Sequence, residues 1–239
     1  MGARFSGQVI LVAGGTGGLG RAVSQAFLDE EATVVVTYRK HEEFAAVEHA
    51  AGMSRERLVG TEVDVTDDAA VGRCVRDLLA RYGQLDVLVN TVGTYTGGAP
   101  LWQMEAAVLD RLLALNLRAG FVLARAVVPT MLKQHGGTIV NIASRAAVEH
   151  AAGAAGYAAS KAAALALMDS LAADVKGTGV RVNSVLPSII DTEANRKAMP
   201  TADSAHWPKP EDIARVILFL CSDDAKVIHG AAIPVYGET

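Results

Sequence analysis

Short runs of apolar, largely β-branched residues recur along the chain, and longer stretches with a helical spacing of apolar residues separate them. The runs predict strands at 8–13, 33–38, 58–65, 85–90, 138–143, 180–186 and 232–236. The intervening stretches predict helices at 21–30, 66–82, 105–134 and 210–222, and one that contains Tyr157 and continues to about residue 176. Strands that alternate with helices predict an α/β fold, namely a doubly wound parallel β-sheet flanked by helices on both faces.

No repeat, low-complexity segment or linker interrupts this alternation, so we expect residues 1–239 to form a single domain. The segment 190–210 contains Pro200, Pro208 and Pro210 among several small polar residues. This composition is typical of a flexible insertion.

Composition excludes several classes of function. The chain is 51% hydrophobic and carries a formal net charge of −4, so we expect no basic surface for nucleic acid or for an anionic membrane. No apolar run is expected to reach the length of a membrane span, and no secretory signal is predicted, which favours a cytoplasmic location. Cys74 and Cys221 are expected to be reduced, and the six histidines lack metal-ligand spacing, so no metal site is predicted.

A glycine-rich turn follows the first predicted strand. Residues 14–20 read Gly-Gly-Thr-Gly-Gly-Leu-Gly and lead directly into a predicted helix. Glycines let the backbone approach a pyrophosphate, and the start of a helix presents unpaired N–H groups to the anion. A tight turn without a ligand is the alternative, and five glycines in seven residues disfavour it. The unit therefore predicts a Rossmann-like dinucleotide site.

The end of the second predicted strand bears on which dinucleotide binds. An acidic residue at this place binds the ribose hydroxyls, whereas an arginine accommodates a 2′-phosphate. The strand ends at Tyr38 and Arg39, and no carboxylate follows until Glu42. NADP(H) is therefore favoured over NAD(H), with a solvated loop cation as the alternative role of Arg39.

Tyr157 and Lys161 are four residues apart in an alanine-rich stretch, so they are expected on one face of a helix. An ammonium beside a phenol favours the phenolate, which makes the pair a candidate proton donor and acceptor. Such a pair also arises by chance, so its meaning depends on the rest of the chain.

Further polar residues follow the ends of predicted strands, at Asp64, Asn90, Ser144 and from Pro187 onward. Ligands bind beyond the carboxyl ends of the strands in a doubly wound sheet. We therefore expect these residues to meet at one site.

The ordered set of motifs resembles the short-chain dehydrogenase/reductase family over nearly the whole chain. Its Thr-Gly-x-x-x-Gly-x-Gly motif appears at 13–20 with alanine first, and its Asn-Asn-Ala-Gly motif at 90–93 as Asn-Thr-Val-Gly. Its Pro-Gly-x-Ile-x-Thr motif appears at 187–192 with serine in place of glycine. Four residues match its catalytic tetrad: Asn116, Ser144, Tyr157 and Lys161.

The resemblance implies a role for each member of this tetrad. Tyr157 would protonate a carbonyl oxygen during reduction, or deprotonate an alcohol in reverse. Lys161 would lower the pKa of Tyr157 and bind the nicotinamide ribose. Ser144 would hold the substrate oxygen, and Asn116 would position a water that links Lys161 to solvent.

The resemblance also implies a set of contacts to the cofactor. The glycine turn would meet the phosphates and ribose, the third strand end the adenine, the fourth strand end the second ribose, and the 187–192 segment the carboxamide. The residues expected to bind the cofactor are Gly14, Thr16, Gly17, Gly18, Leu19, Gly20, Arg39, Asp64, Val65, Asn90, Gly93, Tyr157, Lys161, Pro187, Ile190 and Thr192.

A ketone or 3-oxoacyl reductase is the broader expectation for the activity. Two alternatives stay open. The segment 195–208, which would cover the substrate, resembles that of dihydropteridine reductases, as does the pair Gly97-Gly98; those enzymes lack the tetrad serine and generally favour NADH. The other alternative is a dinucleotide-binding regulator without turnover, which predicts a damaged tetrad. The resemblance further implies a homo-oligomer, either a tetramer or a dimer, acting on a small-molecule substrate.

Overall fold

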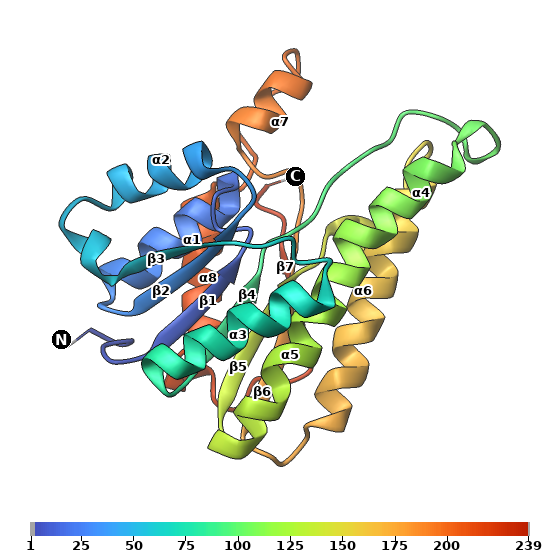
Figure 1. The fold of residues 1–239 in the computed structure, drawn as a ribbon. Coiled ribbons are helices and arrows are strands. Elements are labelled where there is room, and N and C mark those ends of the chain that lie inside the picture. The colour runs from blue at the N-terminus through green and yellow to red at the C-terminus, as the bar shows by residue number, and fades with distance from the viewer. Residues whose placement is uncertain (1–2, 239) are drawn as a thin grey trace.

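Seven strands form one parallel sheet through the middle of the molecule (Figure 1). The structure is a computed structural model and describes residues 3–238. The strands follow the spatial order β3-β2-β1-β4-β5-β6-β7. Their bounds are β1 Val9–Ala13, β2 Thr33–Tyr38, β3 Leu58–Glu62, β4 Val87–Asn90, β5 Gly137–Ile142, β6 Val180–Pro187 and β7 Ala232–Val235. The order reverses between β1 and β4, which opens a crevice at the carboxyl ends of these two strands.

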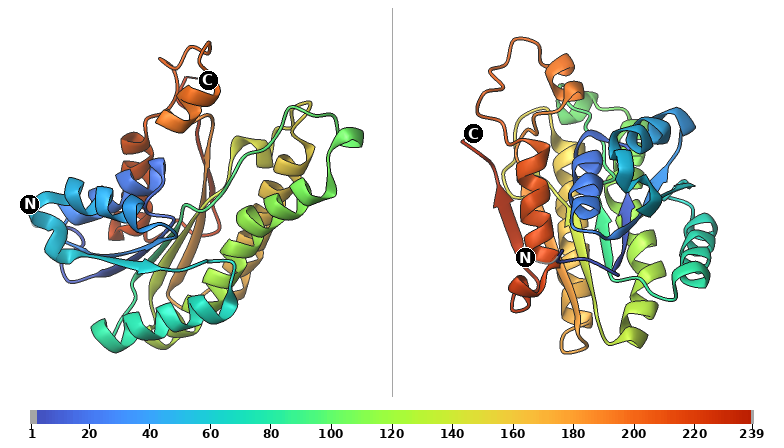
Figure 2. Two further views of the ribbon diagram at one scale, coloured as in Figure 1. Left: turned by 45° about the horizontal axis from the view of Figure 1, so that its top comes forward. Right: turned by 90° about the vertical axis from the view of Figure 1, so that its left-hand side faces the viewer.

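Helices cover both faces of this sheet, as the views in Figures 1 and 2 agree. Their bounds are α1 Gly18–Asp29, α2 His41–Ala51, α3 Asp68–Tyr82, α4 Ala106–Leu113, α5 Ala119–Gln134, α6 Ala155–Asp174, α7 Glu193–Ala198 and α8 Pro210–Cys221. Because side chains alternate along a strand, β1 sends Ile10 and Val12 to one face and Leu11 to the other. The predicted α/β fold, a Rossmann-like doubly wound parallel sheet, is confirmed.

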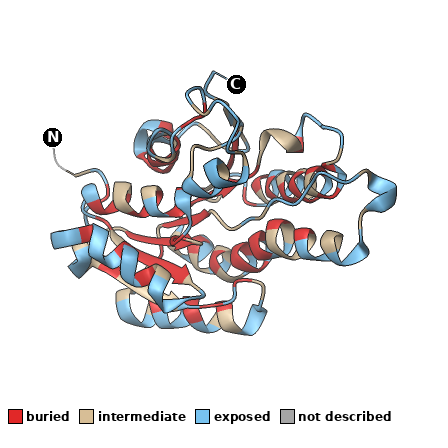
Figure 3. Ribbon diagram, turned by 90° about the horizontal axis from the view of Figure 1, so that it is seen from above, coloured by how far each residue is buried: buried red, intermediate tan, exposed pale blue. Residues whose placement is uncertain are grey.

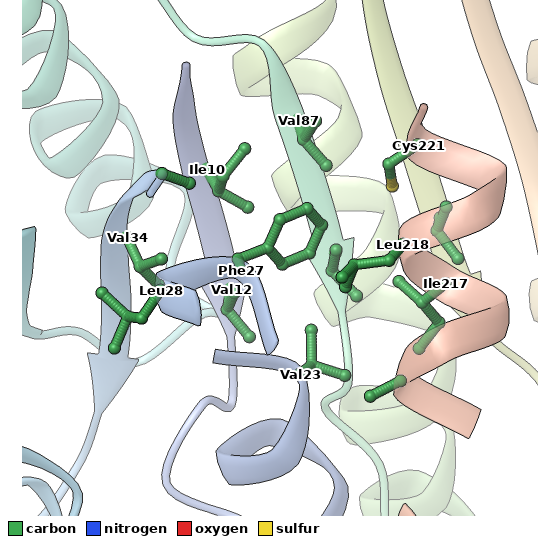
Figure 4. Packing of buried hydrophobic residues seen from close by; sticks show 14 of the residues in the cluster. Ile10, Val12, Val23, Phe27, Leu28, Val34, Val87, Ile217, Leu218 and Cys221 are labelled. Atoms are coloured by element: carbon green, nitrogen blue, oxygen red, sulfur yellow. The ribbon is translucent and has the colours of Figure 1, made fainter. Parts of the chain in front are cut away.

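The first core layer lies between the sheet and the helices α1 and α8. Figure 4 shows Phe27 of α1 and Leu218 of α8 pointing toward each other, with Val87 of β4 in the same cluster. The second layer packs α3, α5 and α6 against the opposite face. The five inner strands are buried almost throughout, the edge strands β3 and β7 are partly exposed, and the outer faces of the helices are exposed (Figure 3). The inner strands therefore form a rigid base for the loops at their ends.

Several predicted boundaries differ from the observed ones. The third strand was expected to reach residue 65 but ends at Glu62. Helix α2 was not predicted, although Phe44, Val47 and Ala51 bury one face of it at helical spacing. The helix that ends at Tyr82 is capped by Asp67, whose carboxylate accepts two backbone N–H groups.

The predicted helix at 105–134 consists of α4, a π-helical segment Ala114–Arg118, and α5. The helical stretch Ala106–Gln134 is long enough to cross a membrane and contains an 18-residue window with a mean hydropathy of 1.5, which is apolar enough to do so. The expectation that no segment reaches that length is therefore wrong. In this fold Leu112 lies against the position of Gly156 in α6, and Leu123 belongs to the second core layer, which is the environment of a core helix.

The segment 190–210 is partly ordered into α7, which stands above the sheet in Figure 2. Thr192 caps this helix, and Arg196 pairs with Asp191. Trp207 is buried, and the backbone N–H of Asp191 donates to the carbonyl of Pro208. Part of the segment in which the sequence indicated a flexible insertion therefore has regular secondary structure and contacts to the rest of the chain.

Candidate active site

A cavity of about 680 Å³ opens at the carboxyl ends of the central strands. Its walls come from four connections: the turns after β1 and β4, the loop between β5 and α6, and the segment after β6. The lining residues include Leu19, Gly93, Tyr95, Ser144, Arg145, His150, Tyr157, Lys161, Pro187, Ile190, Asn195 and Met199. Ser144 and the residues from Pro187 onward thus meet in one place, as the sequence predicts, whereas Asp64 and Asn90 are not among the lining residues.

Tyr157 lies in the first turns of α6, half-buried in the wall of this cavity. A side-chain hydrogen bond joins its phenol to Ser144. The oxygen of Ser144 also accepts the backbone N–H of Ala146 at 3.2 Å, which leaves the serine proton to point at the phenol. Such a donor stabilises the phenolate, and the hydrogen bond accordingly lowers the pKa of Tyr157.

Burial nevertheless dominates, so the pKa of Tyr157 lies above its ordinary value. Tyr95, whose ring meets that of Tyr157 edge to face at 4.9 Å, raises this pKa further. Lys161 is not among the causes of the shift. The expectation that Lys161 lowers the pKa of Tyr157 therefore differs from the structure, in which Ser144 is the group that does so.

Lys161 is 5% exposed, one helical turn after Tyr157. Its ammonium donates to the carbonyl of Ile142 at 2.8 Å, at the end of β5. Loss of hydration disfavours the charged form and lowers the pKa of Lys161 to about 8. The Lys161 amino group, with its lowered pKa, is therefore buried in the wall of the cavity.

Asn116 is buried within the π-helical segment between α4 and α5. Its carbonyl oxygen accepts the N–H of Thr94 at 2.8 Å, and its amide donates to the Thr94 carbonyl and to the hydroxyl of Ser160. Asn116 thereby ties the turn after β4 to α6, which carries Tyr157. A π-helical bulge is common at functional sites because it re-aims side chains.

The turn after β4 passes close to these groups. A Cβ atom at Gly93 would lie 3.0 Å from the Lys161 ammonium nitrogen and 3.1 Å from the Asn116 carbonyl oxygen. Asn90, at the strand end, donates to Asn141 of β5. A glycine at position 93 therefore keeps the space above Lys161 open.

The glycine turn fits an anionic group. Gly14 has φ +75°, and a Cβ at Gly20 would lie 2.2 Å from the carbonyl oxygen of Gly14, so both positions need glycine. Gly17 caps α1 without a side-chain hydrogen bond, and no acidic residue lies in the first turn. The N–H groups at this end are therefore available to a pyrophosphate. The turn also carries Thr16 and, in α1, Leu19.

The segment after β6 reaches across to this helix. A Cβ at Gly18 would lie 2.7 Å from the Thr192 methyl carbon, so the two strand ends flank one space. Pro187 and Ile190 line the cavity itself. The structure thus brings together the predicted residues of the first and sixth strands.

The predicted adenosine end lies at β2 and β3. Arg39 is exposed directly after β2, and its charge lowers the pKa of Asp64. The hydrogen bonds that Thr66 donates to the Asp64 carboxylate lower this pKa more strongly, so the carboxylate is engaged in a local turn. Val65 is buried beside it.

Sequence reasoning missed several residues of the cavity wall, among them Tyr95 and Arg145, whereas Asn195 and Met199 lie in the segment that was expected to cover the substrate. Tyr95 and Arg145 could have been found from their places, since each follows shortly after a predicted site residue. Arg145 pairs with Glu149 at 2.7 Å, and its guanidinium lies 5.1 Å from the ring centroid of Tyr236. Within residues 3–238 no group of three or more His, Cys, Asp or Glu side chains is placed to hold a metal ion.

Comparison with known proteins agrees with this geometry. The family model described as short chain dehydrogenase matches residues 8–203. The chain belongs to the short-chain dehydrogenase family. Among curated members, the 3-oxoacyl-[acyl-carrier-protein] reductase FabG of Thermotoga maritima is 33% identical, covering 98% of each chain. D-threitol dehydrogenase of Mycolicibacterium smegmatis is also 33% identical, covering 98% of this chain and 93% of that one.

Two solved structures are closely similar to the whole chain. ElxO with NADP bound has a TM-score of 0.91 at 25% identity, covering 96% of this chain and 97% of that chain. Levodione reductase has a TM-score of 0.89 at 28% identity, covering 97% of each. The protein is therefore an NAD(P)-dependent oxidoreductase of this family.

Proposed function

We propose that this short-chain dehydrogenase reduces the carbonyl group of a ketone or a 3-oxoacyl compound, with NADP(H) preferred over NAD(H). The observation that carries the proposal is the hydrogen bond between Ser144 and Tyr157 in the wall of a cavity that has the Lys161 ammonium at its base.

In the reducing direction, Tyr157 donates its proton to the carbonyl oxygen, which Ser144 holds by its hydroxyl group. The high pKa of Tyr157 keeps the phenol protonated, as a general acid must be. Lys161, whose amino group is buried in the wall of the cavity, would bind the nicotinamide ribose. Asn116 holds the turn after β4 against helix α6. It would also position a water that links Lys161 to solvent.

The residues present fit a dinucleotide. The uncapped start of α1, with Gly14, Thr16, Gly17, Gly18, Leu19 and Gly20, would hold the pyrophosphate. Asn90 and Gly93 would bind the nicotinamide ribose together with Lys161. Pro187, Ile190 and Thr192 would bind the carboxamide, and Asp64 and Val65 the adenine. When bound, the nicotinamide supplies or accepts the hydride.

The preference for NADP(H) rests on Arg39 at the end of β2. A structural neighbour, ElxO, holds NADP. Arg39→Asp would test this proposal, since it is expected to reverse the ratio of NADPH to NADH affinity, measured by nicotinamide fluorescence. An unchanged ratio would remove Arg39 from the explanation.

The substrate class rests on the cavity and the relatives. Relatives named for 3-oxoacyl and diol substrates, including the meso-2,3-butanediol dehydrogenase of Serratia marcescens (33% identical, covering 98% of this chain and 95% of that one), favour a carbonyl/alcohol pair. The comparisons give no support to the dihydropteridine alternative. Asn195 and Met199 line the cavity, which supports a substrate-covering role for the segment 190–210.

NADPH consumption with a panel of ketones, 3-oxoacyl thioesters and quinonoid dihydropterin tests this function. Tyr157→Phe is expected to lower kcat by about 10²- to 10⁴-fold on any accepted substrate, because it removes the acid. Its dinucleotide affinity is expected to stay within about twofold of wild type, because the glycine turn is intact. Equal rates in both proteins would refute the acid role, and turnover by neither would favour the dinucleotide-binding regulator.

A cytoplasmic location and a homo-oligomeric state, dimer or tetramer, complete the proposal. The oligomer is supported by an apolar groove of about 280 Å³ between α5 and α6, lined in part by Phe121, Val128 and Leu167.

A further inference from the structure

The adenosine end of the site contains a carboxylate that the end of β2 lacks. Glu43, in the first turn of α2, accepts a hydrogen bond from the hydroxyl of Thr16 at 3.2 Å. Thr16 belongs to the glycine turn and is 9% exposed. The hydrogen bond therefore joins the turn that faces the phosphates to the helix that follows the ribose-binding strand.

Helix α2 is held firmly, so the position of Glu43 is not that of a loose surface side chain. The ring of Phe44 stacks on Tyr38 of β2, with centroids 5.1 Å apart. On its other side Phe44 lies over β3, where a Cβ at Gly60 would be 2.6 Å from the ring. These contacts orient the first turn of α2 toward the glycine turn.

The charges around Glu43 compete with one another. Lys40 lies 3.8 Å from the Glu43 carboxylate, and Arg39 precedes it at the strand end. Glu43 thus occupies two groups, the Thr16 hydroxyl and the Lys40 ammonium, that would otherwise donate to an anion. A ribose diol can donate to a carboxylate, whereas a 2′-phosphate, with a charge of about −1.5 to −2, is repelled by it.

We propose that Glu43 is a specificity-determining residue that reduces the preference for NADP(H) created by Arg39, by accepting from Thr16 and Lys40 at the place where the 2′-phosphate binds. This inference rests on the proposed dinucleotide function. Glu43 supplies, from helix α2, the acidic residue that a doubly wound fold often carries at the end of the second strand. Binding of a 2′-phosphate then requires the contact between Thr16 and Glu43 to open.

Calorimetric titration of the full chain with NADP⁺ and with NAD⁺ tests the inference. Glu43→Gln is expected to raise NADP⁺ affinity by about five- to tenfold at low salt and to leave NAD⁺ affinity within about twofold. The gain is expected to shrink in 0.5 M salt, since it arises from charge. Adding Lys40→Gln to Glu43→Gln is expected to remove part of it.

Glu42→Gln is the matched control, because it removes the same charge from the neighbouring, exposed position of the same helical turn. An equal gain in this control would overturn the inference, as would a parallel change for both dinucleotides in Glu43→Gln. Wild type that binds neither dinucleotide would overturn the proposed function as well, so the two failures are distinguishable.

Discussion

Lys161 places an ammonium group in the interior with one backbone carbonyl, that of Ile142, as its hydrogen-bond acceptor. A buried charge of this kind costs folding stability and is retained where chemistry needs it. The lowered pKa of about 8 determines how this cost in folding stability depends on pH. Below pH 8 the group is charged in the folded and the unfolded chain, and the cost is complete. Between pH 8 and 10.5 the folded chain releases the proton first, so the cost disappears as the pH rises.

Lys161→Met is therefore expected to increase the free energy of unfolding at pH 7 by about 1–3 kcal/mol while it removes activity. Urea denaturation at pH 7 and at pH 10.5 checks this, since the gain should be smaller at the higher pH. If Lys161→Met were less stable than wild type by the same amount at pH 7 and at pH 10.5, the result would contradict the buried-charge explanation.

Tyr95 contributes to the pKa of Tyr157 as well as to the cavity wall. Tyr95→Phe keeps the ring and removes the hydroxyl, so the pKa of Tyr157 is expected to fall. Because the acid must be protonated during reduction, activity is lost as the pH rises through that pKa. The alkaline limb of the kcat profile is thus expected to move to lower pH.

Tyr95→Leu is the companion variant. It also removes the ring contact, which is worth about 0.5–1.5 kcal/mol for an edge-to-face pair, and is expected to raise KM as well. A pH profile identical to wild type in both variants would show that Tyr95 acts only through packing.

At the scale of elements, the glycine turn and the α4–α5 junction determine where the site groups lie. Both look simple in sequence, but each depends on close contact with another segment. The turn places Gly20 directly on the Gly14 carbonyl, whereas Gly17 has an extended cap conformation with φ −73° and no contact that a Cβ would violate, its nearest atom being 3.4 Å away.

Gly20→Ala is consequently expected to lower the free energy of unfolding by about 2 kcal/mol or more, because the Cβ displaces the Gly14 backbone. Gly17→Ala, the control, should change stability by less than about 0.5 kcal/mol. Thermal denaturation of both variants measures the difference. Similar melting temperatures would show that the turn tolerates a side chain at position 20.

The α4–α5 junction illustrates what periodicity leaves out. Apolar spacing predicts one helix at 105–134, and the stretch is indeed helical throughout. The π-helical segment at Asn116 has only five residues, which is too short to be recognised from that spacing. It arises where the Asn116 amide meets Thr94 and Ser160, which belong to other parts of the chain.

At the scale of the whole molecule, the apolar groove between α5 and α6 bears on assembly. Phe121 is 42% exposed there, and the groove is lined mainly by apolar side chains. Phe121→Glu is expected to shift the protein toward monomer in sedimentation velocity, because a charge in an apolar interface loses hydration. Glu48→Gln on the exposed face of α2 serves as a control. A wild-type monomer would refute the oligomer.

The sequence by itself determined the layered fold and the kind of chemistry. Alternating apolar runs and helical stretches dictate a doubly wound parallel sheet, and such a sheet gathers the residues after its strands at one edge. The glycine spacing at 14–20 and the four-residue step from Tyr157 to Lys161 are local geometry, so they could be inferred without coordinates.

Only the tertiary structure decided the relations between distant segments. It buried Lys161, made Ser144 the group that lowers the pKa of Tyr157, set Tyr95 against that ring, and brought Glu43 to Thr16. Desolvation and hydrogen bonding depend on which atoms of other elements lie within a few ångströms. Local periodicity fixes which face of an element is apolar, but it does not specify these neighbours.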